Sequence, residues 1–212
     1  MRLMRKTGLA SMLVLVMAAT AAAQTPAQKV TLTAIEPLRA LAWQSLASDP
    51  SGDGLHPRLP DAKALSYAID PATQIVWFKV DVYEPLPEHF FGINVAFNTD
   101  EDPQSSTGMA WWGTNKIKFH RLVSAYLFDA GPYWQGVAGL SDAEGAGKMN
   151  MNNLSRDVKV ALDRDHRAIL VGVPRASLGT APTVRAIATV GSMMVNNDDI
   201  PNEGMVVVKL KP

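Results

Sequence analysis

The sequence contains no cysteine, which excludes disulfide bonds and thiolate metal sites. Neither sign of charge dominates, with 20 basic and 20 acidic residues, and aromatic residues make up only 7% of the chain. Beyond the N-terminal segment, no apolar run approaches the roughly 20 residues that a membrane-spanning helix needs. A chain of this length can bury a sufficient hydrophobic core without disulfides, so we expect a single globular domain.

The N-terminal segment has the layout of a secretory signal peptide. A basic start at residues 2–6 precedes a short apolar run, and three alanines at 21–23 form an A-x-A-like cleavage site. A membrane anchor is the competing interpretation, but the apolar run is short for a span. We therefore expect residues 1–23 to be removed and the mature protein to be periplasmic or secreted, without a membrane span.

The charge balance of the expected mature chain argues against two classes of partner. The segment removed carries three basic residues and no acidic ones, which leaves 17 basic against 20 acidic residues. A slightly acidic chain without a Lys/Arg cluster lacks the electrostatic footprint of a nucleic-acid-binding protein. The same balance argues against binding to an anionic membrane surface.

Apolar residues recur mostly with a period of two. In QIVWFKVDV (74–82) and FGINVAFN (91–98) they alternate, as expected for half-buried antiparallel strands. Further strands are expected at 157–163, 167–173, 183–191 and 205–210, where the segments alternate or are rich in β-branched residues. Proline, glycine, Asn and Asp punctuate the connections. The pattern predicts an all-β fold, an antiparallel two-sheet β-sandwich of jelly-roll type with about nine to ten strands.

Residues 24–48 are expected to form a lead-in with the first strand, and residues 49–212 the sandwich, together one domain. The segment 116–127 is ambiguous, because its apolar residues fit a helical stripe as well as an alternating one. Its Tyr, Phe and Val residues favour a strand. The segment PRASLG (174–179) is expected to be one helical turn that closes a strand.

Three acidic turns are candidate calcium sites. Their carboxylates are Asp49 and Asp53 in DPSGDG, Asp100 and Asp102 in TDEDPQSSTG, and Asp198 and Asp199 in NNDDIPNEG. Calcium takes six to eight oxygen ligands, and an EF-hand is excluded because Ser105 and Trp111 replace its glycine and glutamate. A sandwich can bring two of the three turns together at one end. The alternative is that aspartate serves only as a turn residue that bonds its own backbone.

The tryptophans are candidate sugar-binding residues. Trp111 and Trp112 are adjacent, and on a strand they would point to opposite faces, so at most one belongs to the core. Trp77 lies on the polar side of its strand. An exposed ring flanked by polar groups suits a sugar, so the candidate ligand-binding residues are Trp77, Trp111, Trp112 and Trp134. The alternative is that these rings cover the sheet beneath a loop or a second layer.

Histidines and methionines provide a weaker signal. The histidines have no paired spacing, which argues against a zinc site; they are His56, His89, His120 and His166. Methionine can be an axial haem ligand opposite histidine, although core filling is its commoner role. A nucleophile elbow, a cysteine nucleophile and a phosphate-binding glycine loop are all absent from the sequence, so we do not expect an enzyme.

The order of four segments resembles the DOMON-like sandwiches, and within them the family-nine-type carbohydrate-binding modules. The segments are DPSGDG (49–54), the strand pair at 61–82, the loop at 97–108 and NNDDIPNEG (196–204). The resemblance implies an antiparallel sandwich, often with structural calcium, that binds sugars in some members and haem in others. It places the family's acidic loop on Asp100 and Asp102. It also implies a clamp of two tryptophans, for which Trp111 or Trp112 needs a partner such as Trp77 or Trp134.

Three functions remain open at this point. The first is an exported, non-catalytic carbohydrate-binding module with a structural calcium, whose partner is a polysaccharide or oligosaccharide. The second is a cell-envelope domain that binds another protein. The third and least favoured is a haem-binding electron-transfer domain of the same fold.

Overall fold

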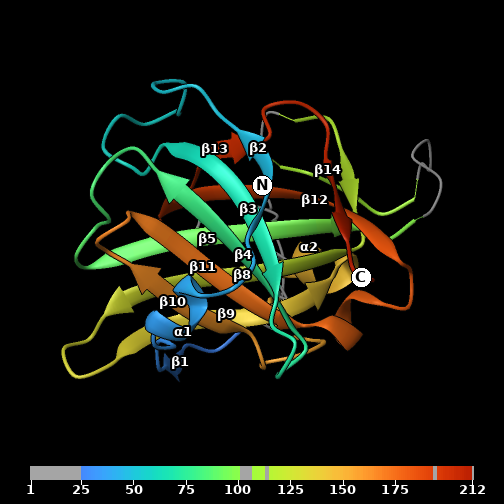
Figure 1. Cartoon of the computed structure of the whole chain (residues 1–212), viewed down its shortest axis with the longest axis horizontal. Helices are drawn as coiled ribbons and strands as arrows, with labels where there is room; N and C mark the ends of the chain where they lie inside the picture. The colour runs from blue at the N-terminus through green and yellow to red at the C-terminus, as the bar shows by residue number, and fades with distance from the viewer. Residues whose placement is uncertain (1–24, 101–106, 113–114, 193–194, 212) are drawn as a thin grey trace, which may run out of the picture.

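The computed structural model describes residues 25–100, 107–112, 115–192 and 195–211. Two antiparallel sheets face each other, with the strands of the five-stranded sheet crossing in front of the seven-stranded one (Figure 1). The larger sheet consists of β1 (Gln28–Val30), β9 (Trp134–Asp142), β8 (Arg121–Asp129), β5 (Phe90–Asn98) and β12 (Thr183–Ser192), with β13 (Val195–Ile200) and β14 (Val206–Lys209) both paired to β12. The smaller sheet consists of β10 (Lys159–Asp163), β11 (Ala168–Pro174), β4 (Ile75–Val82), β3 (Ala62–Ile69) and β2 (Gln44–Ser48).

The all-β sandwich predicted from the sequence is confirmed, but the strand number is wrong. The described residues contain 14 strands, including the small hairpin of β6 (Met109–Ala110) and β7 (Lys118–Phe119). Most of the additional strands are short, and β13 is polar, so alternation of apolar residues did not reveal them; β9 (WQGVAGLSD) is long but interrupted by two glycines. The segment 116–127 forms strands, as favoured, and the expected turn at 174–179 is the 3-10 helix η1 (Arg175–Leu178).

The main core fills the space between the two sheets. The alternating residues of β4, Val76, Phe78, Val80 and Val82, all belong to it, as do the inward residues of β5. Phe78 and Phe97 meet across the two sheets with ring centroids 5.1 Å apart. The period-two pattern therefore correctly identified the faces that bury apolar surface.

Both sheets also carry apolar residues on their outer faces, and each outer face is covered. On the smaller sheet, α1 (Glu36–Arg39) and its neighbours cover Trp77 and Leu170. On the larger sheet, a second cluster contains Trp111, Phe119 and Met151, beside α2 (Ala143–Gly147). Within the described part of the chain, no helix is long and apolar enough to cross a membrane.

The segment NNDDIPNEG is not a turn along its whole length, contrary to expectation. Residues 196–200 belong to β13, which pairs with β12 through an irregularity at Val190/Gly191. A strand rich in Asn and Asp is unusual, because these residues have low β-propensity. Here three of the polar side chains, Asn197, Asp198 and Asp199, are buried. They are therefore held by tertiary contacts that local sequence does not display.

Candidate metal centre

Two of the three acidic segments meet at one end of the sandwich, which is one of the arrangements considered from the sequence. Asp49 follows β2, Asp53 lies in the next loop, and Asp198 lies in β13. One carboxylate oxygen from each of the three residues lies within 4.8 Å of the other two. Such a spacing allows a single cation to contact all three carboxylates.

The loop after β2 is folded back onto the start of β3. Gly52 has φ +91°, a conformation that side-chain-bearing residues rarely adopt, and its N–H donates to Asp61 Oδ2 at 2.6 Å. The hydroxyl of Tyr83 donates to the carbonyl of Asp49 at 2.7 Å. Asp61 thereby joins the acidic group, although the sequence analysis did not select it. The only sequence signal that could have found it is its position directly before a strand and shortly after DPSGDG (49–54).

Asn197 clamps this loop onto β13. Its side-chain oxygen accepts from the N–H of His56 at 2.6 Å, and its amide nitrogen donates to the carbonyl of Pro60 at 2.9 Å. A Cβ atom on Gly54 would lie 2.7 Å from Asn197 Nδ2, so a side chain there would push this amide away from its hydrogen-bond partners. The two acidic segments are thus fastened together by an uncharged side-chain amide.

Two carboxylate oxygens in this group are buried without a hydrogen-bond partner. They are Asp49 Oδ2 and Asp61 Oδ1, and each residue is only 6% exposed. By contrast, Asp198 Oδ2 accepts from the N–H of Ala62 at 2.7 Å. A buried, unpaired carboxylate is costly, so native proteins either protonate it or pair it with a cation. Either protonation or a bound cation would therefore account for the two orphaned oxygens.

The pKa values of the buried aspartates reflect the same energetic cost of burying a carboxylate. Burial, followed by the charges of Asp53 and Asp61, raises the pKa of Asp49 to about 6. The pKa of Asp198 is also raised, mainly by burial and further by Asp61, Asp49 and Asp53, although the Ala62 hydrogen bond acts against this. Without a cation, the group therefore holds protons at a pH where isolated aspartates are ionised.

The donors around the centre are oxygens and amides. A hollow of about 50 Å³ adjoins the cluster and is lined by Asp53, Leu55, Asn196, Asn197, Asp198, Asp199 and Asn202. Asn202 Nδ2 donates to Asp53 Oδ2 at 2.8 Å, which holds the most exposed of the carboxylates. Carboxylate and amide oxygens are hard ligands that suit Ca²⁺ rather than Zn²⁺. The residues present therefore fit a calcium ion.

The remaining predicted acidic ligands lie elsewhere. Asp199 accepts from Trp111 Nε1 at 2.8 Å. Asp100 is separate from the cluster; it accepts from the hydroxyl of Thr107 at 2.6 Å and lies 3.5 Å from His120 Nε2. Asp102, the second acid of that loop, lies outside the described residues. The Asp100 loop was one of the three candidate calcium sites, and its described part is held by a threonine and a histidine.

The tryptophan pair divides between core and surface, as predicted, but not for the predicted reason. Trp111 is 6% exposed and Trp112 40% exposed. The strand β6 ends at Ala110, so strand alternation does not apply to either residue. Their rings stack at 5.0 Å with an angle of 20°, and both meet Phe119 edge-on. Trp112 therefore lies on top of Trp111 instead of on an opposite face.

The other two candidate tryptophans are packed against apolar residues. Trp77 is 2% exposed, so the expectation that it lies on an open polar face is wrong. The α1 segment covers it, which is the second-layer alternative considered from the sequence. Trp134 is half-buried and meets Phe91 edge-on at 5.3 Å. Neither ring stands opposite Trp112 in the described contacts.

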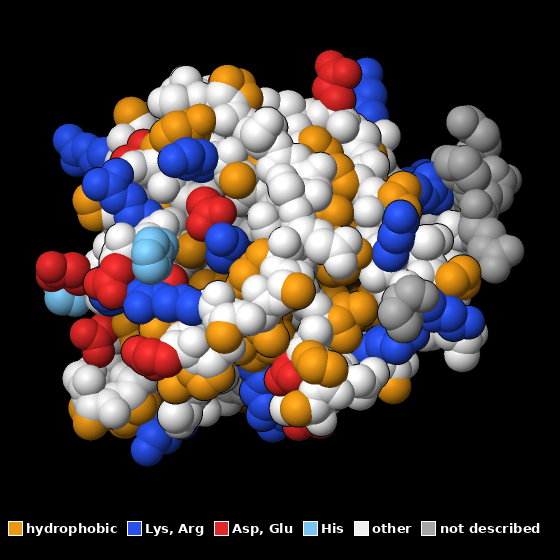
Figure 2. All heavy atoms as spheres, in the orientation of Figure 1, with side chains coloured by type: hydrophobic (Ala, Val, Ile, Leu, Met, Phe, Trp, Pro, Cys, Tyr) orange, Lys and Arg blue, Asp and Glu red, His pale blue; other side chains and the backbone are white. Residues whose placement is uncertain are grey.

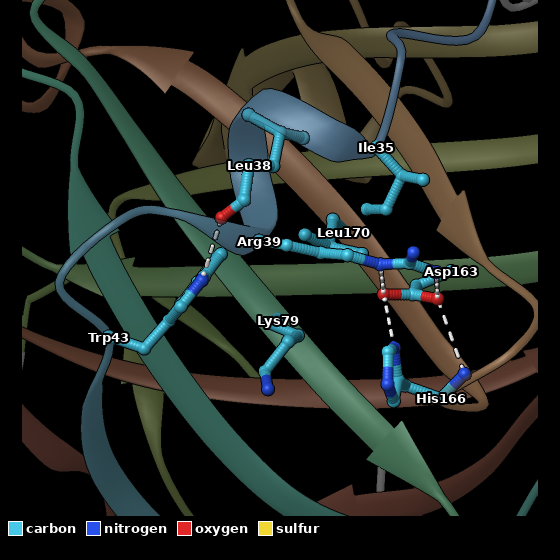
Figure 3. A pocket seen from close by; sticks show the side chains of 8 residues that line it. All are labelled: Ile35, Leu38, Arg39, Trp43, Lys79, Asp163, His166 and Leu170. Atoms are coloured by element: carbon cyan, nitrogen blue, oxygen red, sulfur yellow. Dashed lines mark hydrogen bonds and ion pairs between the residues drawn. The ribbon is translucent and has the colours of Figure 1, made fainter.

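A separate hollow of about 210 Å³ lies between α1 and the smaller sheet (Figure 3). Arg39 reaches from α1 and donates to both carboxylate oxygens of Asp163, at 2.8 and 2.5 Å, and His166 bonds the same carboxylate at 2.9 Å. Lys79 lies 3.3 Å from Asp81 and over the ring of Trp43 at 5.4 Å. These charged side chains are paired with each other, and the Arg39–Asp163 pair fastens α1 to the smaller sheet.

No protein-family model matches the chain, and a search of curated proteins finds no significant relative. Its function is therefore argued from the arrangement of its own residues.

Proposed function

We propose that the protein is an exported, non-catalytic carbohydrate-binding module whose calcium centre holds a tryptophan platform. The observation that carries the proposal is the exposed ring of Trp112, stacked on Trp111, which is itself bonded to Asp199 beside the candidate metal ligand Asp198. A supported aromatic ring offers a large contact area at a small entropic cost, which suits the C–H face of a sugar.

Two contacts fix this platform to the segment that carries the metal ligand. The first is the Trp111–Asp199 hydrogen bond, and the second involves Asn115, which is 8% exposed. Asn115 donates to the carbonyls of Pro201 and Gly204 and accepts from the N–H of Gly204 at 3.0 Å. Because Asp198 and these partners lie in one short stretch of chain, calcium binding there would also order the platform.

In this proposal the residues have distinct roles. Asp49, Asp53, Asp61 and Asp198 hold the cation, which would neutralise their mutual repulsion. Trp111 supports Trp112, and Trp112 stacks on the ligand. The cation has a structural role and takes no part in a reaction.

The test is retention of the purified protein on a panel of insoluble polysaccharides, in calcium and in chelator. The proposal expects retention in calcium, weaker retention in chelator, and loss of retention in Trp112→Ala with little change in melting temperature. Phe90→Ala is the matched control, because Phe90 is an equally exposed aromatic residue at 40%. Unchanged retention of Trp112→Ala, or equal losses in both variants, would refute the platform.

A second candidate, an envelope protein-interaction domain, is favoured by one specific observation. Apolar side chains are exposed beside the acidic centre, with Leu55 at 61% and Val195 at 44%. A shallow hollow there is lined by His56, Pro57, Arg58, Leu59 and Val195. Leu55→Asp would abolish capture of an envelope partner while leaving polysaccharide retention unchanged. If Leu55→Asp leaves capture of an envelope partner unchanged, the carbohydrate-binding module is favoured.

A further inference from the structure

A large groove lies at the end of the sandwich opposite the acidic centre. Asp61 precedes β3 and Ile69 ends it, so the eight residues of β3 separate the two sites by about 25 Å. The groove has a volume of about 520 Å³ and is lined by Ala42, Gln44, Tyr67, Ile69, Pro71, Gln74, Arg175, Lys209 and Lys211. That volume is within the usual range of ligand-binding clefts.

Three cations line this groove, and none of its lining residues is acidic: Arg175 begins η1, directly after β11, and Lys209 and Lys211 come from β14 and the residues that follow it. Within the described residues, none of the three forms an ion pair. Figure 2 shows Lys and Arg side chains gathered around the place where Figure 1 marks the C-terminus. In the hollow between α1 and the smaller sheet, by contrast, Arg39 and Lys79 are both paired with carboxylates.

The acid in the turn beside the groove, Asp70, already accepts hydrogen bonds from its own turn. Asp70 accepts from the N–H of Ala72 at 2.9 Å and from the hydroxyl of Thr73 at 2.6 Å. Its carboxylate is therefore directed into its own turn. Three positive charges that line one concave surface, and form no ion pair among the described residues, attract an anion.

Two amides give the groove a polar pattern besides its charge. Gln44 Oε1 accepts from the hydroxyl of Tyr67 at 2.9 Å, which leaves the amide nitrogen of Gln44 to donate to a ligand. Gln74 Nε2 donates to the carbonyl of Pro71 at 2.9 Å, which leaves its oxygen to accept from a ligand hydroxyl. Amides that are fixed at one end are suited to the hydroxyl groups of a saccharide.

We propose that this groove binds the carboxylate groups of an acidic saccharide. The planar guanidinium of Arg175 matches a carboxylate with two hydrogen bonds, and Lys209 and Lys211 act as point charges along the chain of sugars. Gln44 and Gln74 bond the ring hydroxyls, and the apolar atoms of Ala42 and Pro71 contact the C–H faces. The site is independent of the Trp112 platform and of the metal centre.

The test uses titration calorimetry with a galacturonic acid trisaccharide and the neutral galactose trisaccharide. We expect the acidic ligand to bind and the neutral one to bind at least about tenfold more weakly, since one charge-assisted hydrogen bond is worth about that factor. Raising the salt from about 0.05 to about 0.5 M should weaken binding of the acidic ligand, because these exposed charges are screened. Equal binding of the two ligands would overturn the proposal.

Matched variants assign the effect to the groove. Lys209→Gln combined with Lys211→Gln should weaken binding of the acidic trisaccharide by about tenfold or more. Arg156→Gln combined with Lys159→Gln changes the net charge equally on exposed residues outside the groove and should leave binding unchanged. An equal loss in both double variants would show a nonspecific charge effect and overturn the proposal.

Two further arms separate this proposal from others. Trp112→Ala should leave binding of the acidic trisaccharide unchanged, so failure of the platform and failure of the groove are distinguishable. Vesicles that contain phosphatidylglycerol present anionic phosphate without sugar carboxylates. If vesicles bind and the trisaccharide does not, and the lysine double variant abolishes vesicle binding, the groove recognises lipid headgroups and the saccharide proposal is wrong.

Discussion

At the scale of single residues, aspartates of similar sequence context have opposite environments. Asp100 lies by His120 and Thr107, whereas Asp49 and Asp61 are buried with an unpartnered oxygen each. The difference arises from what surrounds the carboxylate, because a turn position alone does not specify solvent access. The buried group is the one that carries a charge cost for a cation to relieve.

Asp61→Asn tests the member of the centre that the sequence analysis missed. The amide oxygen can still accept from Gly52, but one negative charge near Asp198 is lost. We expect calcium affinity, measured by calorimetry, to fall about tenfold or more, and the melting temperature in chelator to stay the same or rise.

Asp157→Asn is the control for this variant, because Asp157 is exposed and outside the centre. Its calcium affinity should equal that of the unmodified protein. A loss of stability in chelator for Asp61→Asn, with calcium affinity unchanged, would mean that Asp61 only shapes the loop.

At the scale of elements, short segments with little sequence signal are held by a few side-chain contacts. The hairpin of β6 and β7 is attached by Trp111 and Asn115, and α1 is attached by Arg39. Elements this short are not stable by themselves, so tertiary contacts decide where they lie.

Asn115→Ala should loosen the hairpin that carries Trp112. The variant removes three hydrogen bonds and leaves backbone groups of the 201–204 turn without these partners. We expect the free energy of unfolding, measured by urea denaturation, to fall by about 1–3 kcal/mol. Polysaccharide retention should weaken as well; full retention at lowered stability would show that the hairpin does not position the platform.

Arg39→Ala should release α1 from the smaller sheet. Asp163 would then remain buried without its main partner, which currently holds its pKa well below the usual range. Because Arg39 is exposed, solvent screens its ion pair, and we expect the loss to be local to α1 with only a small change in overall stability. Faster amide exchange in residues 35–43, with exchange in β5 unchanged, is the expected readout; uniform protection would show that α1 stays docked without the ion pair.

At the scale of the whole molecule, two sets of carboxylates depend on pH in opposite directions. The pKa values of Asp49 and Asp198 are raised by folding, so the stability linked to them is present below about pH 4 and is lost as the pH rises through about 6 and beyond. The pKa of Asp163 is lowered, so its contribution is present above about pH 4 and is lost as the pH falls. Calcium should remove the first dependence, because it replaces the protons.

In chelator, we therefore expect the melting temperature to be highest between about pH 4 and 6 and to fall toward pH 8. The increase in melting temperature caused by calcium should grow over the same rise in pH, because protons compete with the metal at the lower pH. Differential scanning calorimetry with and without calcium measures both effects. A calcium effect that is equal at pH 5 and pH 8 would contradict binding at these carboxylates.

Particular residues show what the sequence could predict. The alternation in β4 correctly assigned Val76, Phe78 and Val80 to the core, since strand geometry sends every second side chain to one face. The same rule placed Trp77 on an open face, where it failed, because a covering segment from the N-terminal part of the chain is a long-range contact. It does not apply to Trp111 and Trp112, which lie just beyond the strand, although one of them is buried and the other exposed as expected.

The sequence by itself determined the all-β class, the antiparallel pairing and the main core, because these follow from the period of apolar residues and the turn residues between them. The tertiary structure decided which acids meet, which tryptophan is exposed and which cations share a groove. Asp49 and Asp198 are distant in the chain. Arg175 follows a strand of the smaller sheet, and Lys211 follows a strand of the larger sheet. The packing of the two sheets is what brings such residues together, and no local pattern encodes that distance.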